Sequence, residues 1–247
     1  MMSQICGHRG AARYAPENTL SGFLWCYNNN VKWSECDVQL TSKGTAVIIH
    51  DQTINRTTNS KGLVYGLSDN DLEVLDAGFW KGRKFKNERI PTLKKLLNFA
   101  KINHLGINIE LKFYDPIRDK YRKDLVNEVA RLINDINVQE QVLISSFDLK
   151  SLFYMRACIP ELSLGVLFES LNLDWYSKVK DLDVKTIHLD YEKTTPSNIR
   201  DIVKYNLIPF VYTCNSPKLI KNLWDEGLGG VITDDPITFL PNKNIKK

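Results

Sequence analysis

No uninterrupted apolar run in the 247-residue chain approaches the roughly 18 residues of a membrane-spanning helix, so we expect no stable membrane insertion. The first residues, MMSQICGHRGAARY, lack the apolar core of a signal peptide, and we therefore expect a cytoplasmic protein. A glycine-rich dinucleotide or P-loop fingerprint is also missing after the first apolar segment, which disfavours an open nucleotide-binding sheet.

Cysteine is scarce, and its five positions form no CxxC pair. An odd count without such pairs argues against a disulfide framework and against a thiolate zinc site, so we expect buried free thiols. A large excess of one charge is absent as well, because 33 basic and 29 acidic residues leave a net charge of +4. That charge is too small to indicate a nucleic-acid partner.

The composition is that of an ordinary globular protein, with 43% hydrophobic and 25% charged residues. Short apolar segments alternate with helix-like segments over nearly the whole length. Eight of these segments read as strands: 5–8, 34–40, 106–111, 142–147, 162–168, 185–190, 207–213 and 230–234. Between them, apolar side chains from Leu125 to Ile136 follow a helical period, Thr92 can cap a helix, and Ser216 with Pro217 can begin another that stops before Gly227.

Strands that alternate with helices are typical of parallel sheets, and eight such units in about 250 residues predict a closed (β/α)8 TIM barrel. One connection is unusually long. Residues 42–91 are rich in turn-forming residues and contain the hairpin-like segment TAVIIHD. Because long connections in compact domains are usually functional, we interpret this segment as a small insertion between the second strand and its helix, within a single domain spanning residues 1–247.

Carboxylates lie on two of the predicted strands, near the ends where barrel active sites form. Glu35 and Asp37 share one face of the second strand, since side chains alternate, while Cys36 points the other way. Glu110 lies on the third. Three neighbouring carboxylates repel one another, and a divalent cation resolves that conflict. An all-oxygen ligand set favours Mg²⁺ or Ca²⁺ over zinc.

Histidines and fixed cations accompany these carboxylates. His8 and Arg9 lie at the end of the first strand, His50 follows the apolar run in the insertion, and Lys112 shares a face with Glu110. A metal, an arginine and a lysine together suit a phosphate-bearing substrate, and two histidines supply proton transfer near neutral pH. The combination predicts phosphoryl-transfer chemistry.

Two further histidines carry less weight. His104 lies in a loop away from the predicted strand ends, and we interpret it as structural. His188 lies on the sixth predicted strand, where the alternation alone leaves open whether it faces the site.

The sequence resembles the glycerophosphodiester phosphodiesterase family. The matching segments fall between residues 6 and 236: GHRG, APENTLSGF, ECDVQLTSKG, VIIHD, NRTTNSKG, LDAGFW, RIPTL, NIELK, LISSFD and VITDDP. The resemblance implies a metal-dependent enzyme with the predicted barrel and insertion, which cleaves small glycerophosphodiesters to glycerol 3-phosphate and an alcohol. It also implies attack by the adjacent glycerol hydroxyl, through a cyclic phosphate. By the same resemblance, the acid–base pair is His8 and His50, the metal ligands are Glu35, Asp37 and Glu110, and the phosphate contacts are Arg9 and Lys112.

The chain departs from the family pattern at four positions outside these roles. Lys43 replaces a usual Asp, Asn30 a usual Gly, Gly229 the Asp of the final DG pair, and Tyr212 a common Trp. Asn tolerates a left-handed backbone, so Asn30 should be harmless. Tyr212 is the change expected to alter packing around the glycerol or the head group.

Three alternatives stay open. Lys112 could form a Schiff base, although neighbouring carboxylates favour its charged form. The barrel could bind a ligand without turnover. The substrate could instead be a lipid-sized diester, as in a lysophospholipase D, but the sequence contains no evident amphipathic membrane helix. The sequence does not determine the oligomeric state.

Overall fold

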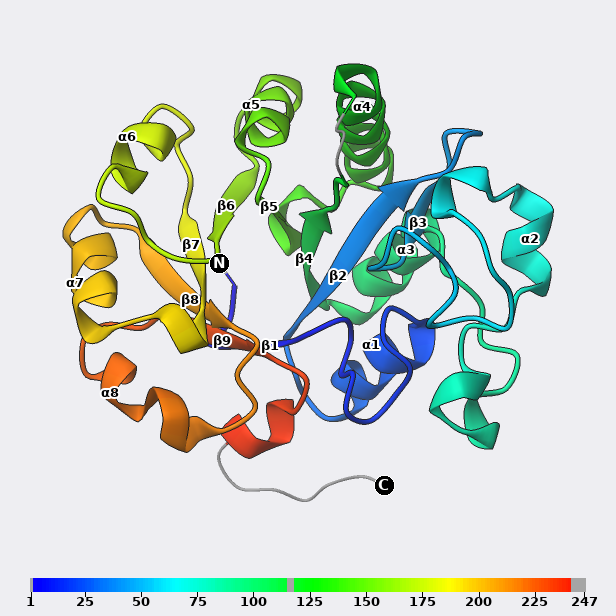
Figure 1. Cartoon of the computed structure of the whole chain (residues 1–247), viewed down its shortest axis with the longest axis horizontal. Coiled ribbons are helices and arrows are strands. Elements are labelled where there is room, and N and C mark those ends of the chain that lie inside the picture. Colours follow the sequence, from blue (N-terminus) through cyan, green and yellow to red (C-terminus); the bar gives the residue numbers. More distant parts are fainter. Residues whose placement is uncertain (1, 115–117, 241–247) are drawn as a thin grey trace.

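Eight parallel strands close into a barrel in the computed structural model, which describes residues 2–114 and 118–240 (Figure 1). The strands follow one another around the barrel in chain order, and pairing of the first with both the second and the last closes it. They are β1 (Ile5–Gly7), β2 (Trp33–Leu40), β4 (Gly106–Leu111), β5 (Val142–Ser146), β6 (Ser163–Phe168), β7 (Thr186–Asp190), β8 (Ile208–Tyr212) and β9 (Gly230–Thr233). The predicted (β/α)8 architecture is thereby confirmed.

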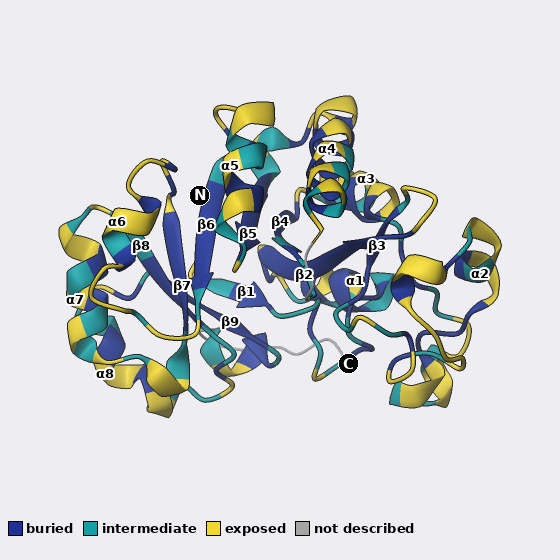
Figure 2. Ribbon diagram, turned by 45° about the horizontal axis from the view of Figure 1, so that its top comes forward, coloured by how far each residue is buried: buried dark blue, intermediate teal, exposed yellow. Residues whose placement is uncertain are grey.

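Helices connect the strands and cover the outside of the barrel, with their exposed faces directed to solvent (Figure 2). They are α1 (Leu20–Asn28), α3 (Leu93–Asn103), α4 (Asp119–Ile136), α5 (Leu149–Cys158), α6 (Trp175–Val179), α7 (Pro196–Lys204) and α8 (Lys221–Trp224). The main apolar core lies between these helices and the strands, which are buried over nearly their whole length. Among the helices described, none combines the length and apolar character needed to cross a membrane.

Local signals predicted some helix ends well and others poorly. Thr92 caps α3 by accepting a hydrogen bond from the backbone N–H of Lys95 at 3.3 Å, as predicted. Ser216 makes no side-chain cap bond, and the chain after it forms a 3₁₀ turn at Pro217–Ile220 before the short α8. The helical segment predicted from Ser216 is present and ends before Gly227, but its first turn is 3₁₀ and α8 has only 4 residues. The Asn30 backbone is left-handed (φ 59°), as its residue type allows.

The long connection from β2 to α3 contains its own short elements. β3 (Ala46–Ile48) returns antiparallel to β2, so the hairpin expected from the sequence is present. Three 3₁₀ turns, Val64–Gly66, Phe79–Lys81 and Arg83–Phe85, and α2 (Asp69–Val74) follow. Their apolar side chains form a cluster separate from the main core: Val47, Ile49, Ile54, Val64, Leu67, Leu72, Leu75, Ala77 and Ile90. This small cluster supports the chain just beyond the carboxyl end of β2.

The cysteines are free thiols. Four are buried, but Cys158, at the end of α5, is exposed. The expectation of buried thiols is wrong at this position, because the last turn of α5 presents the side chain outward.

Candidate active site

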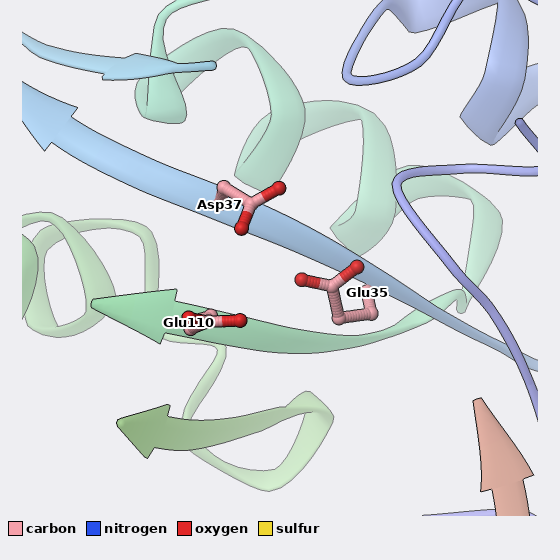
Figure 3. Close-up of side chains that lie close together, drawn as sticks. All are labelled: Glu35, Asp37 and Glu110. Carbon is pink, nitrogen blue, oxygen red and sulfur yellow. The ribbon is translucent and has the colours of Figure 1, made fainter. Parts of the chain in front are cut away.

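The three carboxylates predicted on neighbouring strands converge where the middle of β2 pairs with the last residues of β4 (Figure 3). Asp37 is paired in register with Glu110, and Glu35 lies two residues earlier on the same face of β2. One oxygen atom from each carboxylate lies within 4.8 Å of the others. Cys36 points to the opposite side, into the main core.

Burial and mutual repulsion make this cluster costly to charge. Burial raises the pKa of Glu35 well above its ordinary value, and the charges of Asp37 and Glu110 raise it further. Burial also raises the pKa of Glu110. For Asp37 burial acts in the same direction, but the positive charges of Arg9 and Lys112 outweigh it and lower the pKa. The cluster therefore combines one carboxyl group whose pKa is lowered with two whose pKa values are raised.

These residues fit a divalent cation. The Oε1 atom of Glu35 is buried and has no hydrogen-bond partner among the described residues, although buried carboxylate oxygens are normally satisfied. The donor set is purely oxygen, which suits hard cations such as Mg²⁺ and Ca²⁺. Asn18 holds Asp37 through two hydrogen bonds. Its Nδ2 donates to Asp37 Oδ2 at 2.8 Å, and its Oδ1 accepts from the Asp37 backbone N–H at 3.2 Å.

Two fixed cations border the cluster. Arg9 Nε lies 3.3 Å from Asp37 Oδ2, and the Arg9 backbone N–H donates to Glu35 Oε2 at 2.8 Å. Arg9 adopts a left-handed backbone (φ 50°), which turns the chain sharply after β1. Lys112 Nζ donates to Glu110 Oε1 at 2.7 Å and lies 3.7 Å from Asp37 Oδ1. An anionic substrate group at the carboxylate cluster would meet both cations.

His8 reaches the cluster from β1. Its Nε2 atom lies 3.9 Å from Glu35 Oε2, and its Nδ1 atom contacts Asp234 Oδ1 at 2.7 Å. Since a carboxylate only accepts, Nδ1 donates in this pair and Nε2 is the atom left to exchange a proton. Asn215 Nδ2 donates to the second oxygen of Asp234 at 3.0 Å.

His50 reaches the same region from the segment after β3. Its Nδ1 atom contacts Asp51 Oδ1 at 2.8 Å, so its Nε2 atom is likewise left for proton exchange. Burial lowers the pKa of His50, which favours the neutral imidazole near pH 7. Gln39 Nε2 donates to the carbonyl oxygens of Ile49, His50 and Asp51 at 2.8, 3.1 and 2.7 Å, which fixes this backbone above β2.

The remaining histidines lie elsewhere. His104 ends α3 at the opposite end of the barrel from the carboxylates, in a left-handed conformation (φ 52°). His188 is fully buried inside the barrel, with Nε2 2.8 Å from Thr186 Oγ1. Burial lowers its pKa to about 3, so it stays neutral.

Five polar residues around the site have no role predicted from the sequence: Glu17, Asn18, Asp51, Arg56 and Asp234. They all fall inside the motif segments PENT, HD, NRTT and TDDP. Each acts on another side chain across a long sequence separation or from an irregular loop, so strand periodicity could not identify it. The motif segments were the available signal.

The structure shows the surroundings of three further departures from the family pattern. Tyr212, at the end of β8, donates to the Phe168 carbonyl at 3.1 Å and packs edge-on against Phe147. A Cβ atom at Gly229 would lie 2.1 Å from Ile208 Cγ2, so this backbone leaves no room for a side chain. Lys43 lines an open groove of about 790 Å³ that borders Tyr114, whose hydroxyl donates to the His50 carbonyl.

The chain is similar over nearly its whole length to proteins of one family. Residues 8–238 match the model of the glycerophosphoryl diester phosphodiesterase family. A glycerophosphodiester phosphodiesterase of Caldanaerobacter subterraneus is 31% identical over 97% of both chains, and a putative glycerophosphodiester phosphodiesterase of Bacillus subtilis is 32% identical over 94% of both. A phosphodiesterase of Oleispira antarctica, solved with the product sn-glycerol-3-phosphate, superposes with a TM-score of 0.89 at 30% identity, covering 95% of this chain and 94% of that one.

Proposed function

Because the chain belongs to the glycerophosphoryl diester phosphodiesterase family, we propose that it hydrolyses glycerophosphodiesters to glycerol 3-phosphate and an alcohol. The observation that carries the proposal is the buried carboxylate cluster on β2 and β4, flanked by two histidines and two fixed cations. The complex of the Oleispira antarctica relative with sn-glycerol-3-phosphate supports the same product.

In this proposal Glu35, Asp37 and Glu110 hold a divalent cation, Mg²⁺ or Ca²⁺. A bound cation of this kind withdraws charge from a phosphoryl oxygen and makes phosphorus easier to attack. Arg9 and Lys112 bind the non-bridging phosphate oxygens and stabilise the negative charge that grows on them in the transition state.

His8 and His50 move the protons. One imidazole takes the proton of the glycerol hydroxyl next to the phosphate while that oxygen bonds to phosphorus. The bond from phosphorus to the alcohol breaks, and the other imidazole gives its proton to the departing oxygen. Water then attacks the cyclic phosphate and loses a proton to the imidazole that gave up its proton in the first step, and the ring oxygen leaves with the proton that the other imidazole took up. The two histidines thus return to their starting states.

The test is release of glycerol 3-phosphate from purified protein, measured with a coupled enzyme. The substrate panel contains glycerophosphodiesters with different head groups, a lysophospholipid, and bis(p-nitrophenyl) phosphate as a diester without an adjacent hydroxyl. We expect turnover of the small glycerophosphodiesters, loss of turnover with a strong chelator, and none of the nitrophenyl diester. Tight binding of glycerophosphodiesters without product would indicate a binding protein instead, and preferred cleavage of the lysophospholipid would indicate a lipid-sized substrate.

We also propose that residues 42–91 form the small insertion of a single-domain barrel. Its separate apolar cluster and its position beside the carboxylates support this division. Since His50 belongs to this segment, the insertion would supply one of the two proton-transfer groups.

A further inference from the structure

A chain of charged contacts joins the His50 segment to the barrel. His50 contacts Asp51, Asp51 contacts Arg56, Arg56 contacts Glu17, and Glu17 accepts from Arg9 Nη1 at 2.9 Å. Arg9 in turn lies against Asp37 of the carboxylate cluster. Glu17 lies between β1 and α1, whereas Asp51 and Arg56 follow β3, so the chain bridges two parts of the fold.

Arg56 is the centre of this bridge. Its guanidinium makes four hydrogen bonds: Nη1 and Nη2 donate to the two oxygens of Glu17 at 2.7 and 2.8 Å, and Nε and Nη2 donate to the two oxygens of Asp51 at 2.7 and 2.9 Å. Bidentate contacts of this kind fix direction as well as distance, and only an arginine can make two of them at once.

The backbone and the ring of His50 are held by different groups. Gln39 and Tyr114 bond to backbone carbonyls of residues 49–51, so they place the segment without restricting the imidazole. The ring orientation depends on Asp51, and Asp51 has both of its oxygens held by Arg56. Loss of Arg56 would therefore release the ring and loosen the loop of residues 49–58, while the bonds from Gln39 and Tyr114 still keep the segment beside β2.

We propose that Arg56 is a positioning residue, which locks Asp51 against Glu17 and so aims the His50 imidazole at the substrate phosphate. The expected effect on kcat rests on the proposed function. The expected effect on the placement of Asp51 and His50 rests on the ion-pair geometry alone. Arg56 touches neither the carboxylate cluster nor the reacting atoms in this arrangement; it acts through Asp51 and His50.

The test compares Arg56→Met, which removes the charge, with Arg56→Lys, which keeps the charge but not the fork. Arg200→Met is the matched control, because Arg200 joins Glu226 at 2.6 Å between two elements far from the carboxylates. We expect kcat of Arg56→Met to fall about 10–100-fold, a part of the worth of a positioned acid or base, with KM within about threefold of wild type. The kcat of Arg56→Lys should lie between those of Arg56→Met and wild type, and the kcat of Arg200→Met should match wild type.

Two readouts separate positioning from general destabilisation. Ethylguanidinium added to Arg56→Ala should restore part of kcat, since the Arg56 side chain is about half exposed and solvent can reach its position. Amide hydrogen exchange across residues 49–58 should quicken in Arg56→Met while the barrel strands exchange as in wild type. In a double-mutant cycle, Asp51→Asn should add little to the loss in Arg56→Met.

Wild-type kcat in folded Arg56→Met would overturn the inference, and so would equal losses in Arg56→Met and Arg56→Lys with no response to ethylguanidinium. If Arg56→Met does not fold, kcat and amide exchange are measured on Arg56→Lys, and wild-type kcat with unchanged exchange across residues 49–58 in that variant would overturn the inference. Absence of turnover in the wild-type enzyme would instead refute the proposed function, and unchanged exchange across residues 49–58 would then refute the positioning role as well.

Discussion

At the scale of the residue, the two imidazoles have the same arrangement. In each, Nδ1 is held by an aspartate and Nε2 is left for proton exchange, through Asp234 for His8 and Asp51 for His50. We expect His8→Ala and His50→Ala each to lower kcat about 10²–10⁴-fold, the usual worth of a positioned acid or base. Steady-state kinetics with circular dichroism tests this. Near-wild-type rates in two folded variants would make the histidines structural.

Lys112 gives a second prediction at this scale. Burial alone would lower its pKa, but Glu110 and Asp37 raise it overall, so the ammonium stays charged and is a poor Schiff-base nucleophile. Lys112→Met should reduce kcat at least as much as it raises KM, because the cation stabilises charge that grows in the transition state. A change confined to KM would mean that Lys112 only gathers substrate. A covalent adduct at Lys112 after borohydride reduction in the presence of substrate would show that the reaction proceeds through an imine and not by the phosphodiesterase mechanism.

At the scale of the element, Asp148 ties two helices together. It caps α5 by accepting from the Ser151 backbone N–H at 3.0 Å, and it accepts from Arg122 of α4 at 2.7 Å. Asp148→Ala removes the cap and leaves the largely buried Arg122 guanidinium with its contact to Asp119, so we expect a loss of about 2–4 kcal/mol in the free energy of unfolding. Asp174→Ala is the control, since the Asp174 side chain makes no cap bond to α6. Urea unfolding measures the stability of both variants. If Asp148→Ala were as stable as Asp174→Ala, this would show that water replaces the contacts of the Asp148 side chain.

At the scale of the whole molecule, the carboxylate cluster couples metal binding to stability and pH. Glu35 and Glu110 have raised pKa values, so the metal-free fold holds protons that the unfolded chain releases at lower pH. Its stability therefore falls as the pH rises above the ordinary glutamate value of about 4.3 toward the raised ones. A cation that displaces these protons should bind more tightly as the pH rises.

We accordingly expect a cation at about 100 times its Kd to raise Tm by about 5–10 °C, from a stabilisation of about 2.7 kcal/mol. The increment should grow with pH and shrink in Asp37→Asn, which removes a ligand charge. Scanning calorimetry of chelator-treated protein, with and without Mg²⁺ or Ca²⁺, measures it. A Tm unaffected by either cation at every pH, together with full turnover of metal-stripped protein, would contradict the metal assignment.

The sequence was sufficient for the barrel and for the carboxylates. Alternation of strands and helices is a local pattern, and period two places Glu35 with Asp37 without knowledge of any neighbour. Parallel strands in a barrel must end at one rim, so Glu110 was expected to join them. Short helices were less predictable: Ser216 and Pro217 resemble a helix start, yet the chain there forms a 3₁₀ turn.

What the sequence by itself determined is therefore the fold class and the identity of the groups that periodicity places at the strand ends. Only the tertiary structure decided which groups orient them. Asp234 meets His8 across 226 residues of chain, and Arg56 meets Glu17 across 39. These partners lie in irregular loops, where no repeat fixes the direction of a side chain. Their contacts exist because barrel closure brings β9 beside β1 and the hairpin of β2 and β3 brings Arg56 over Glu17.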